Sequence, residues 1–196
     1  IGWREWAAVS DHSVKRVDPS LGPVSTAVGV LGMPGLTAYH GLLDVGQPKA
    51  GDTLVVSAAS GAVGAVVGQI GKINGCNVIG VAGSDKKCNY VKNDLGFDYT
   101  INYKTQEVSS ELKRLSPNGV DVYFDNVGGP VLDAVLDNLA FKARIAICGQ
   151  ISQYNSDEIP LGPRNMWALL RTQSKAEGFL VYAFEQQHEI SRARLA

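Results

Sequence analysis

Cysteine and histidine are scarce in this chain of 196 residues, which contains three of each. The cysteines, Cys76, Cys88 and Cys148, form no Cys-x-x-Cys pair and no Cys/His cluster with the spacing of metal ligands. We therefore expect no metal site. Scattered cysteines in odd number are typical of free thiols in a reducing compartment, which favours a cytoplasmic location over secretion.

An excess of charge and long apolar runs are also lacking. The 18 basic and 19 acidic residues give a formal net charge of −1, so no bulk field attracts nucleic acid or an anionic membrane. No apolar run approaches the roughly 20 residues of a membrane-spanning helix, and no basic segment precedes an apolar one as in a secretory signal. These absences predict that neither nucleic acid nor a membrane is a partner.

Glycine, by contrast, is abundant, with 22 residues against 8 prolines, which suits many tight turns between strands and helices. The runs at 54–56 and 78–81 are continuously apolar, as is typical of strands that helices cover on both faces. We expect strands at 53–59, 77–82, 99–103, 120–126, 143–148 and 178–184, and helices at 62–74, 86–95, 107–115, 131–139 and from 165 onward. This order predicts an α/β fold with a Rossmann-type doubly wound parallel sheet.

The segment before the first of these strands is less regular. Residues 1–18 have the composition of irregular structure, as the tail of a preceding domain would. A helix is expected to begin in 25–31, to be interrupted by Pro34 and Gly35, and to resume over 36–44. A polar loop is expected at 150–164.

The most informative segment follows the strand at 53–59, where an apolar run breaks into a Gly-x-x-Gly turn and a helix of small residues begins at once. Gly61 would let the backbone approach a pyrophosphate, and Gly64 would allow close packing of helix and strand. Ala59 replaces the first glycine of the usual G-x-G-x-x-G motif, so the turn must tolerate a Cβ there. Backbone N–H groups at Ala62 and Val63 would bind phosphate oxygens. The pattern predicts a dinucleotide site.

The end of the next strand favours NADP(H) over NAD(H). Sites for NAD usually carry an acid about 20 residues past the glycines. Here Gly83 and Ser84 leave room for a 2′-phosphate, and either Lys86 or Lys87 could neutralise it. Asp85 would indicate NAD unless it caps the following helix, which its position favours. A solvated helix face would explain the two lysines without a ligand.

Six blocks of sequence match one protein family: 31–39 (Leu-Gly-Met-Pro-Gly-Leu-Thr-Ala-Tyr), 58–64, 123–129 (Tyr-Phe-Asp-Asn-Val-Gly-Gly), 148–155 (Cys-Gly-Gln-Ile-Ser-Gln-Tyr-Asn), 162–165 and 177–179. Through them the chain, over about residues 1–182, resembles the zinc-independent, NADP-dependent medium-chain dehydrogenases/reductases of the prostaglandin reductase (leukotriene B4 dehydrogenase) and curcumin reductase type.

This resemblance implies roles for individual residues. Ser84, Lys87 and Tyr103 would hold the 2′-phosphate of NADP(H). The remaining cofactor-lining residues would be Met33, Thr37, Asn126, Cys148, Gly149, Ser152 and Tyr154. Tyr154 would also orient the substrate by bonding its carbonyl oxygen, whereas Cys148 would be a small buried side chain and not a nucleophile. From the residues alone, Asn126 could instead satisfy the Gly-Gly turn after it, and Met33 could fill the core.

The resemblance also implies an enzyme that reduces the activated carbon–carbon double bond of an enone or enal by hydride transfer from NADPH. Three alternatives stay open: a quinone reductase of the same superfamily, a non-catalytic NADP(H)-binding or sensing module, and a methyltransferase-type domain, whose glycine-rich turn is similar.

Members of this family are larger, two-domain chains. We therefore expect residues 1–18 to be the tail of the N-terminal catalytic domain and residues 19–196 to be the NADP(H)-binding Rossmann domain, without the family's C-terminal part. A fragment of this kind is expected to be inactive by itself. The resemblance suggests a homodimer through the edge of the last strand, near 178–181.

Overall fold

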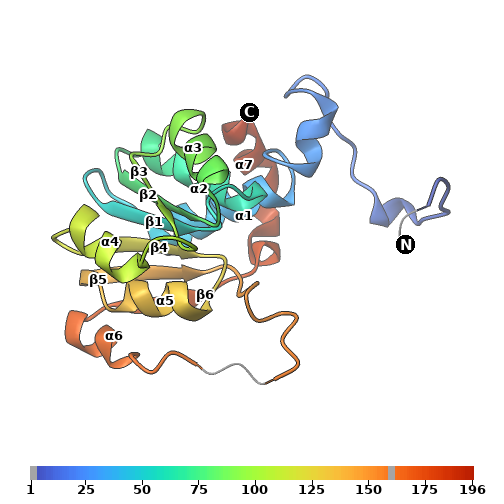
Figure 1. Cartoon of the computed structure of the whole chain (residues 1–196). Helices are drawn as coiled ribbons and strands as arrows, with labels where there is room; N and C mark the ends of the chain where they lie inside the picture. Colours follow the sequence, from blue (N-terminus) through green and yellow to red (C-terminus); the bar gives the residue numbers. More distant parts are fainter. Residues whose placement is uncertain (1–3, 159–161) are drawn as a thin grey trace.

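A computed structural model describes residues 4–158 and 162–196 of the chain. At its centre six strands pair in parallel, in the order β3-β2-β1-β4-β5-β6 (Figure 1). The strands are β1 (Thr53–Ser57), β2 (Asn77–Ala82), β3 (Tyr99–Asn102), β4 (Val120–Asp125), β5 (Leu139–Ile147) and β6 (Lys175–Gly178). The arrangement confirms the predicted Rossmann-type sheet.

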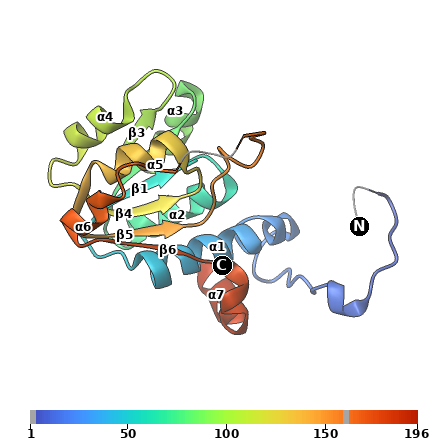
Figure 2. The same cartoon turned by 90° about the horizontal axis from the view of Figure 1, so that it is seen from below.

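Helices cover both faces of this sheet (Figures 1 and 2). One face carries α1 (Met33–His40), α2 (Ala62–Ile73) and α3 (Asp85–Asn93), and the other carries α4 (Val108–Leu115), α5 (Gly129–Leu136) and α6 (Trp167–Thr172). The last helix, α7 (His188–Leu195), packs beside α1. This two-sided cover is what the continuously apolar strands predict.

The central strands supply side chains to both faces. Val55 and Tyr123 belong to the cluster under α4, α5 and α6, whereas Leu54, Val56 and Phe124 belong to the cluster under α1 and α2. All five are fully buried. Burying one large aliphatic side chain contributes about 1.5–3 kcal/mol, so the two central strands anchor the fold from both sides.

The strand order reverses between β1 and β4, since the chain leaves β1 toward β2 and β3 and later returns on the other side. Val56 pairs with Phe124, so the carboxyl ends of the two strands meet at one edge of the sheet. Open α/β sheets bind ligands at such a reversal. The fold therefore places the glycine turn beside the residues that follow β4.

The expected interruption of the first helix is wrong. Pro34 and Gly35 lie in the first turn of α1, where the missing N–H of proline costs no helical hydrogen bond. The segment before it, Val24–Val28, is a short 3-10 helix, and α1 continues into a π-helical turn at Gly41–Gly46. The sequence pattern did not distinguish a helix break from a helix start.

The strand expected at 178–184 is also misplaced. The sixth strand is Lys175–Gly178, and Val181–Gln187 forms a 3-10 helix that leads into α7. The apolar residues of the segment 178–184 pack on other elements instead. The Phe184 ring stacks on His40 with centroids 4.5 Å apart, and the Phe179 ring stands edge-on to Phe124. These contacts explain why the segment is apolar without being a strand.

The helix expected at 131–139 begins and ends earlier, at Gly129 and Leu136. Asn138 helps to end it, because its Nδ2 donates to the carbonyl oxygen of Ala134 at 2.8 Å. The chain can then enter β5 at Leu139, several residues before the expected strand start at 143.

The N-terminal segment, blue in Figure 1, extends away from the sheet. Between residues 4 and 18 its only regular element is a 3-10 turn at Asp11–Ser13. The expected irregular segment and the expected loop at 150–164 agree with the structure where it describes them, and residues 1–3 and 159–161 lie outside the described residues. None of the helices in the described ranges is both long and apolar enough to cross a membrane.

Candidate dinucleotide-binding site

The turn after β1 is held by its own backbone. Ala58 has a left-handed conformation (φ 49°), and its carbonyl oxygen accepts a hydrogen bond from the Gly61 N–H at 2.9 Å. A Cβ at Gly64 would lie 2.4 Å from the same carbonyl oxygen. The glycine at position 64 therefore lets α2 begin directly against the turn.

Ala59 fits this turn because the next strand makes room for it. The residue is fully buried, and its N–H donates to the carbonyl oxygen of Val81 at 3.1 Å. A Cβ added at Gly80 would lie 2.9 Å from the Cβ of Ala59, so the glycine in β2 leaves the space that Ala59 occupies. The unusual backbone conformation falls on Ala58, which the sequence motif did not indicate.

The start of α2 is open. Gly61 precedes the helix, and no side chain caps it. The N–H groups of the first helical turn, including those of Ala62 and Val63, have no acceptor within the helix, and the helix dipole adds positive potential there. This end of α2 has the properties of a phosphate site.

Gly83, Ser84 and Tyr103 come together where β2 and β3 end. The Tyr103 N–H donates to the carbonyl oxygen of Ala82 at 3.1 Å. The Tyr103 phenol then lies against the turn after β2, since a Cβ at Gly83 would be 2.8 Å from its hydroxyl oxygen. The turn thus places the Tyr103 phenol and the Ser84 hydroxyl beside Gly83, which has no side chain of its own.

The helix after this turn is capped by Ser84, whose Oγ accepts a hydrogen bond from the Lys87 N–H at 3.3 Å. The expectation that Asp85 is the cap is wrong. Its Oδ1 accepts instead from Asn102 Nδ2 at 2.7 Å. Lys86 and Lys87 are exposed, and neither forms an ion pair with any residue that the structure describes. Two cations are thus available beside the turn.

A buried carboxylate organises the end of β4. Asp125 is fully buried, and its Oδ1 accepts hydrogen bonds from four donors: the Tyr123 hydroxyl at 2.8 Å, the Ser57 hydroxyl at 3.3 Å, and the N–H groups of Val127 at 3.0 Å and Gly128 at 2.9 Å. Burial, with the charge of Asp125, raises the pKa of Tyr123 well above its usual value, so this phenol stays a donor. Oδ2 of Asp125 is buried and has no partner among the described residues.

Asn126 is tied to the neighbouring strand. Its backbone N–H donates to Ser57 Oγ and its side-chain Nδ2 to the Ser57 carbonyl oxygen, both at 2.8 Å. Asp125, rather than Asn126, holds the Gly-Gly turn, in which Gly128 and Gly129 have φ of 68° and 56°. The amide oxygen of Asn126 accepts no hydrogen bond from the described residues.

The loop after β5 is bonded to the end of β4. The N–H groups of Cys148 and Gly149 donate to the carbonyl oxygen of Asp125 at 2.8 and 3.1 Å. Ser152 Oγ donates to the carbonyl oxygen of Val127 at 2.6 Å, and the Tyr154 hydroxyl accepts from the Gln150 N–H at 2.9 Å. The positions of Cys148, Gly149 and Ser152 therefore depend on the end of β4.

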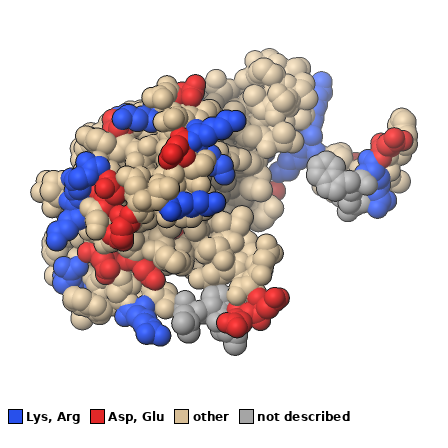
Figure 3. All heavy atoms as spheres, in the orientation of Figure 1, with Lys and Arg blue, Asp and Glu red and all other residues tan. Residues whose placement is uncertain are grey.

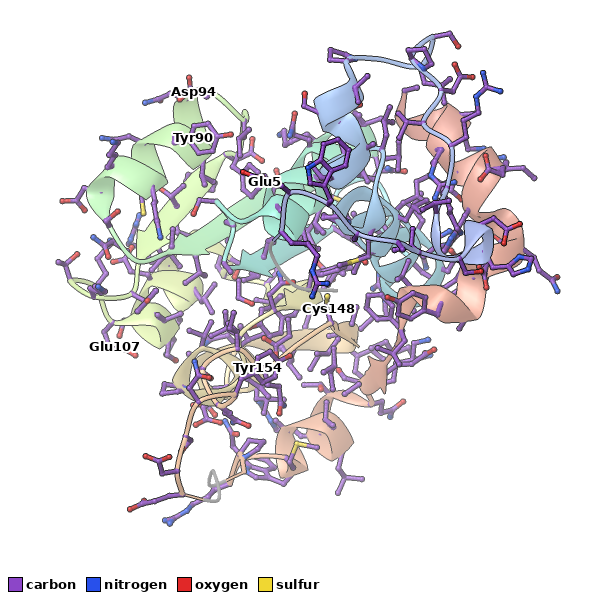
Figure 4. The ribbon with its side chains drawn as sticks, turned by 90° about the vertical axis from the view of Figure 1, so that its right-hand side faces the viewer. Glu5, Tyr90, Asp94, Glu107, Cys148 and Tyr154 are labelled. Atoms are coloured by element: carbon purple, nitrogen blue, oxygen red, sulfur yellow. The ribbon has the colours of Figure 1, made fainter. Side chains whose placement is uncertain are left out.

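The chemistry of Cys148 and Tyr154 differs, although both lie near the middle of the view in Figure 4. Burial, with a contribution from the charge of Asp125, raises the pKa of Cys148 to about 11, so the thiol is neutral near pH 7 and a poor nucleophile. The Tyr154 side chain is exposed. Because its oxygen accepts from Gln150, its O–H proton remains available to an acceptor such as a carbonyl.

Met33 and Thr37 lie one turn apart on α1. Thr37 Oγ1 donates to the Met33 carbonyl oxygen at 2.7 Å, and Met33 itself is 57% exposed, which argues against a role as core filler. A hollow of about 430 Å³ opens between the N-terminal segment and the C-terminal helices, lined among others by Arg16, Met33 and Arg192. Met33 is the only predicted cofactor residue on its walls, so this hollow is separate from the glycine turn.

The described ranges contain no group of three or more His, Cys, Asp or Glu side chains that could hold a metal ion. Basic and acidic side chains are intermingled over the face shown in Figure 3, which agrees with the absence of a single-sign field in the sequence.

Five adjacent strands thus end in residues able to hold an elongated anionic ligand: Tyr103 after β3, Gly83 after β2, the glycine turn after β1, Asn126 after β4 and Cys148 after β5. Sequence reasoning missed three residues that support them, Ser57, Asn102 and Asp125. Each is a short polar residue that ends a strand of the parallel sheet, and that position was the available signal.

Fold and site together define a dinucleotide-binding domain of the doubly wound class. Comparison with known families agrees: the zinc-binding dehydrogenase family matches residues 62–194. The chain belongs to this family.

Its relatives include the NADPH-dependent curcumin reductase of Escherichia coli, 48% identical over 92% of this chain and 53% of that protein, and the NADP⁺-dependent 2-alkenal reductase of Nicotiana tabacum, 46% identical over 93% and 54%. Among solved structures, CurA of Vibrio vulnificus in complex with NADPH superposes with a TM-score of 0.82, at 50% identity over 87% of this chain and 52% of that one. The chain spans about half the length of the relatives it matches. The resemblance to NADP-dependent reductases is confirmed.

Proposed function

We propose that this chain is the NADP(H)-binding domain of an oxidoreductase that reduces the activated carbon–carbon double bond of enones or enals. The observation that carries the proposal is the turn after β2, where the Tyr103 phenol lies against Gly83 and Ser84 caps α3. Lys86 and Lys87 follow in the first turn of that helix, and neither forms an ion pair with a described residue. An extra phosphate needs such a set of donors. The names of the relatives, which include NADP-dependent alkenal and curcumin reductases, support the same reading.

The site would hold the cofactor along the edge of the sheet. Lys87 and Tyr103 would bind the 2′-phosphate, and the N–H groups at the start of α2 would bind the pyrophosphate. Gly61 would keep that approach free of a side chain, and Gly64 lets α2 begin directly against the turn. Asn126 would bind the ribose beside the nicotinamide, and Met33, Thr37, Cys148, Gly149 and Ser152 would line the rest.

NADPH supplies the hydride for the reduction when it is bound. Tyr154 would donate its free O–H proton to the substrate carbonyl oxygen and stabilise the negative charge that develops on it during reduction. Cys148 would take no part in proton or group transfer, since its raised pKa keeps the thiol neutral. The Tyr154 hydroxyl, as a donor near the neutral and partly buried Cys148, suits the stabilisation of an oxyanion.

The proposal extends to zinc independence, a cytoplasmic location and a homodimer. Among the described residues β6 pairs only with β5, and all four of its residues are exposed, so one edge of this strand is open to a second copy. Residues 1–18 would be the tail of a separate catalytic domain that closes over the nicotinamide end. Sedimentation of the intact protein would test the dimer, and a monomer at micromolar concentration would refute it.

The activity is tested with the intact protein, NADPH and a medium-chain enone, by following the loss of NADPH absorbance. We expect turnover with the enone, and a loss of about tenfold or more in kcat for Tyr154→Phe. Tyr182→Phe, which changes an exposed tyrosine outside the site, is the matched control. Turnover with a quinone but not with the enone would favour a quinone reductase, and no turnover with either would leave a binding module.

A further inference from the structure

Asp85 lies close to the position at which NAD sites carry an acid, but its carboxylate is hydrogen-bonded to the Asn102 side chain. Asp85 directly follows Ser84, about 20 residues past the glycine turn, which is the spacing of the acid that binds the ribose hydroxyls of NAD. Its backbone begins α3 and its side chain is exposed. One of its oxygens nevertheless accepts a hydrogen bond of 2.7 Å from Asn102 Nδ2.

Asn102 is built to make this contact. The residue is 5% exposed and ends β3. Its Oδ1 accepts from the Lys104 N–H at 3.2 Å, and its own N–H donates to Gln106 Oε1 at 2.8 Å. The Lys104 N–H can only donate, so the amide must turn its oxygen toward Lys104 and its Nδ2 toward Asp85. The orientation of the amide is therefore fixed by its surroundings.

The contact joins the two turns that form the 2′-phosphate pocket. Asn102 immediately precedes Tyr103, and Asp85 immediately follows Ser84. A carboxylate released from Asn102 at this position would face the doubly charged 2′-phosphate of NADPH and repel it. The same carboxylate would offer an acceptor to the 2′-hydroxyl of NADH.

We propose that Asn102 is a specificity-determining residue, which favours NADPH over NADH by holding the Asp85 carboxylate at the start of α3, away from the 2′-position of the cofactor. The inference rests on the NADP(H) site proposed above. It assigns to Asn102 an electrostatic effect that acts only through Asp85, and this dependence separates it from a purely structural role.

A double-mutant cycle tests the inference by direct binding. NADPH and NADH are titrated separately against the intact protein, its Asn102→Ala and Asp85→Asn variants and the double variant, with intrinsic fluorescence as the readout. We expect Asn102→Ala to lower the preference for NADPH about tenfold, which corresponds to about 1.4 kcal/mol. Asp85→Asn keeps the preference, because it leaves no charge to release. In the Asp85→Asn background, Asn102→Ala leaves the preference unchanged.

An equal loss of preference in both backgrounds would overturn the inference, because Asn102 would then act only by placing Tyr103. A preference that survives Asn102→Ala overturns it as well. Asn138→Ala is the matched control, since Asn138 donates to Ser109 and Ala134 on the far side of the sheet from α3. If Asn102→Ala does not fold, Asn102→Ser removes the amide donor with a smaller change. A wild-type protein with equal affinity for both cofactors would refute the proposed NADP(H) site itself.

Discussion

Ser57, Asp125 and Asn126 show how few side chains shape the carboxyl edge of the sheet. Asp125 gathers four donors on one buried oxygen, and Ser57 links that carboxylate to the backbone of Asn126. Because Nδ2 of Asn126 donates to the Ser57 carbonyl oxygen in β1, only the amide oxygen of this side chain has no hydrogen bond to a described residue. A buried, hydrogen-bonded network of this kind fixes the orientation of the functional group at its end.

Gly64→Ala should destabilise the protein by about 1–3 kcal/mol, because the new Cβ would meet the Ala58 carbonyl oxygen at 2.4 Å and backbone cannot move aside cheaply. Urea unfolding measures the change. Gly162→Ala is the control, since no atom of the described residues lies within 4 Å of its Cβ position, and it should change stability by less than about 0.5 kcal/mol. Equal stability of the two variants would show that α2 does not need a glycine against the turn.

Two thiols should make the protein less stable in alkali. Burial raises the pKa of Cys76 and of Cys148 from 9.0 to about 11, so the folded protein keeps protons that the unfolded chain releases. Their contribution is therefore fully present below about pH 9 and is lost as the pH rises toward about 11. Unfolding free energies measured across this range should fall less steeply in Cys76→Ala and Cys148→Ala. Identical slopes in wild type and variants would contradict the assignment.

The strands and helices could be predicted from the sequence wherever burial on two faces left a continuous apolar run. β1, β2 and β4 satisfy that condition, and their expected positions agree with the structure within two residues. β6 does not, since Lys175–Gly178 is exposed and carries no apolar signal. The apolar run after it covers α1 and β4 through Phe184 and Phe179, a tertiary role that local pattern cannot distinguish from a strand.

The candidate site divides in the same way. Sequence motifs indicated the glycine turn and the Gly83–Ser84 turn, because each turn is formed by the backbone of residues adjacent in the sequence. The pairs that support the site join distant residues: Ser57 binds Asn126 across 69 positions, and Asn102 binds Asp85 across 17. Such pairs become visible only when the strand order brings the ends of the strands together.

The C-terminal helix α7 depends on one buried side chain of α1. His40 is fully buried, and its Nδ1 lies 2.7 Å from Asp44 Oδ2 while its Nε2 lies 3.1 Å from Ser191 Oγ in α7. The ring also stacks on Phe184. These contacts tie two elements that are 151 residues apart in the chain.

His40→Ala should therefore loosen α7 before the sheet. We expect a loss of about 2–4 kcal/mol from the cavity and the broken hydrogen bonds, and about 1 kcal/mol for Ser191→Ala. Hydrogen exchange should become faster in α7 while the amides of β1 stay protected. His12→Ala, which changes a fully exposed histidine, is the control. Uniform loss of protection across the chain would contradict a local role.

As a whole, the described part of the chain presents a binding edge on a two-sided core, and its relatives are about twice as long. The residues proposed to bind the adenosine and pyrophosphate parts of a cofactor lie at the carboxyl ends of β1, β2 and β3. On the substrate side, by contrast, Tyr154 alone is a candidate to bind the substrate directly. Binding of the cofactor and reduction of the substrate are therefore separable properties. Cofactor binding is the property to test on this chain.

The measurement that tests the central claim most directly is a titration of the intact protein with NADPH and with NADH at one ionic strength. NADPH should bind at least about tenfold more tightly, and Lys87→Ala should remove most of that preference by deleting a charge-assisted contact. Lys86→Ala identifies which lysine binds the phosphate, and Lys92→Ala in the last turn of α3 is the control. Equal affinity for the two cofactors, or a preference untouched by either Lys87→Ala or Lys86→Ala, would contradict the account.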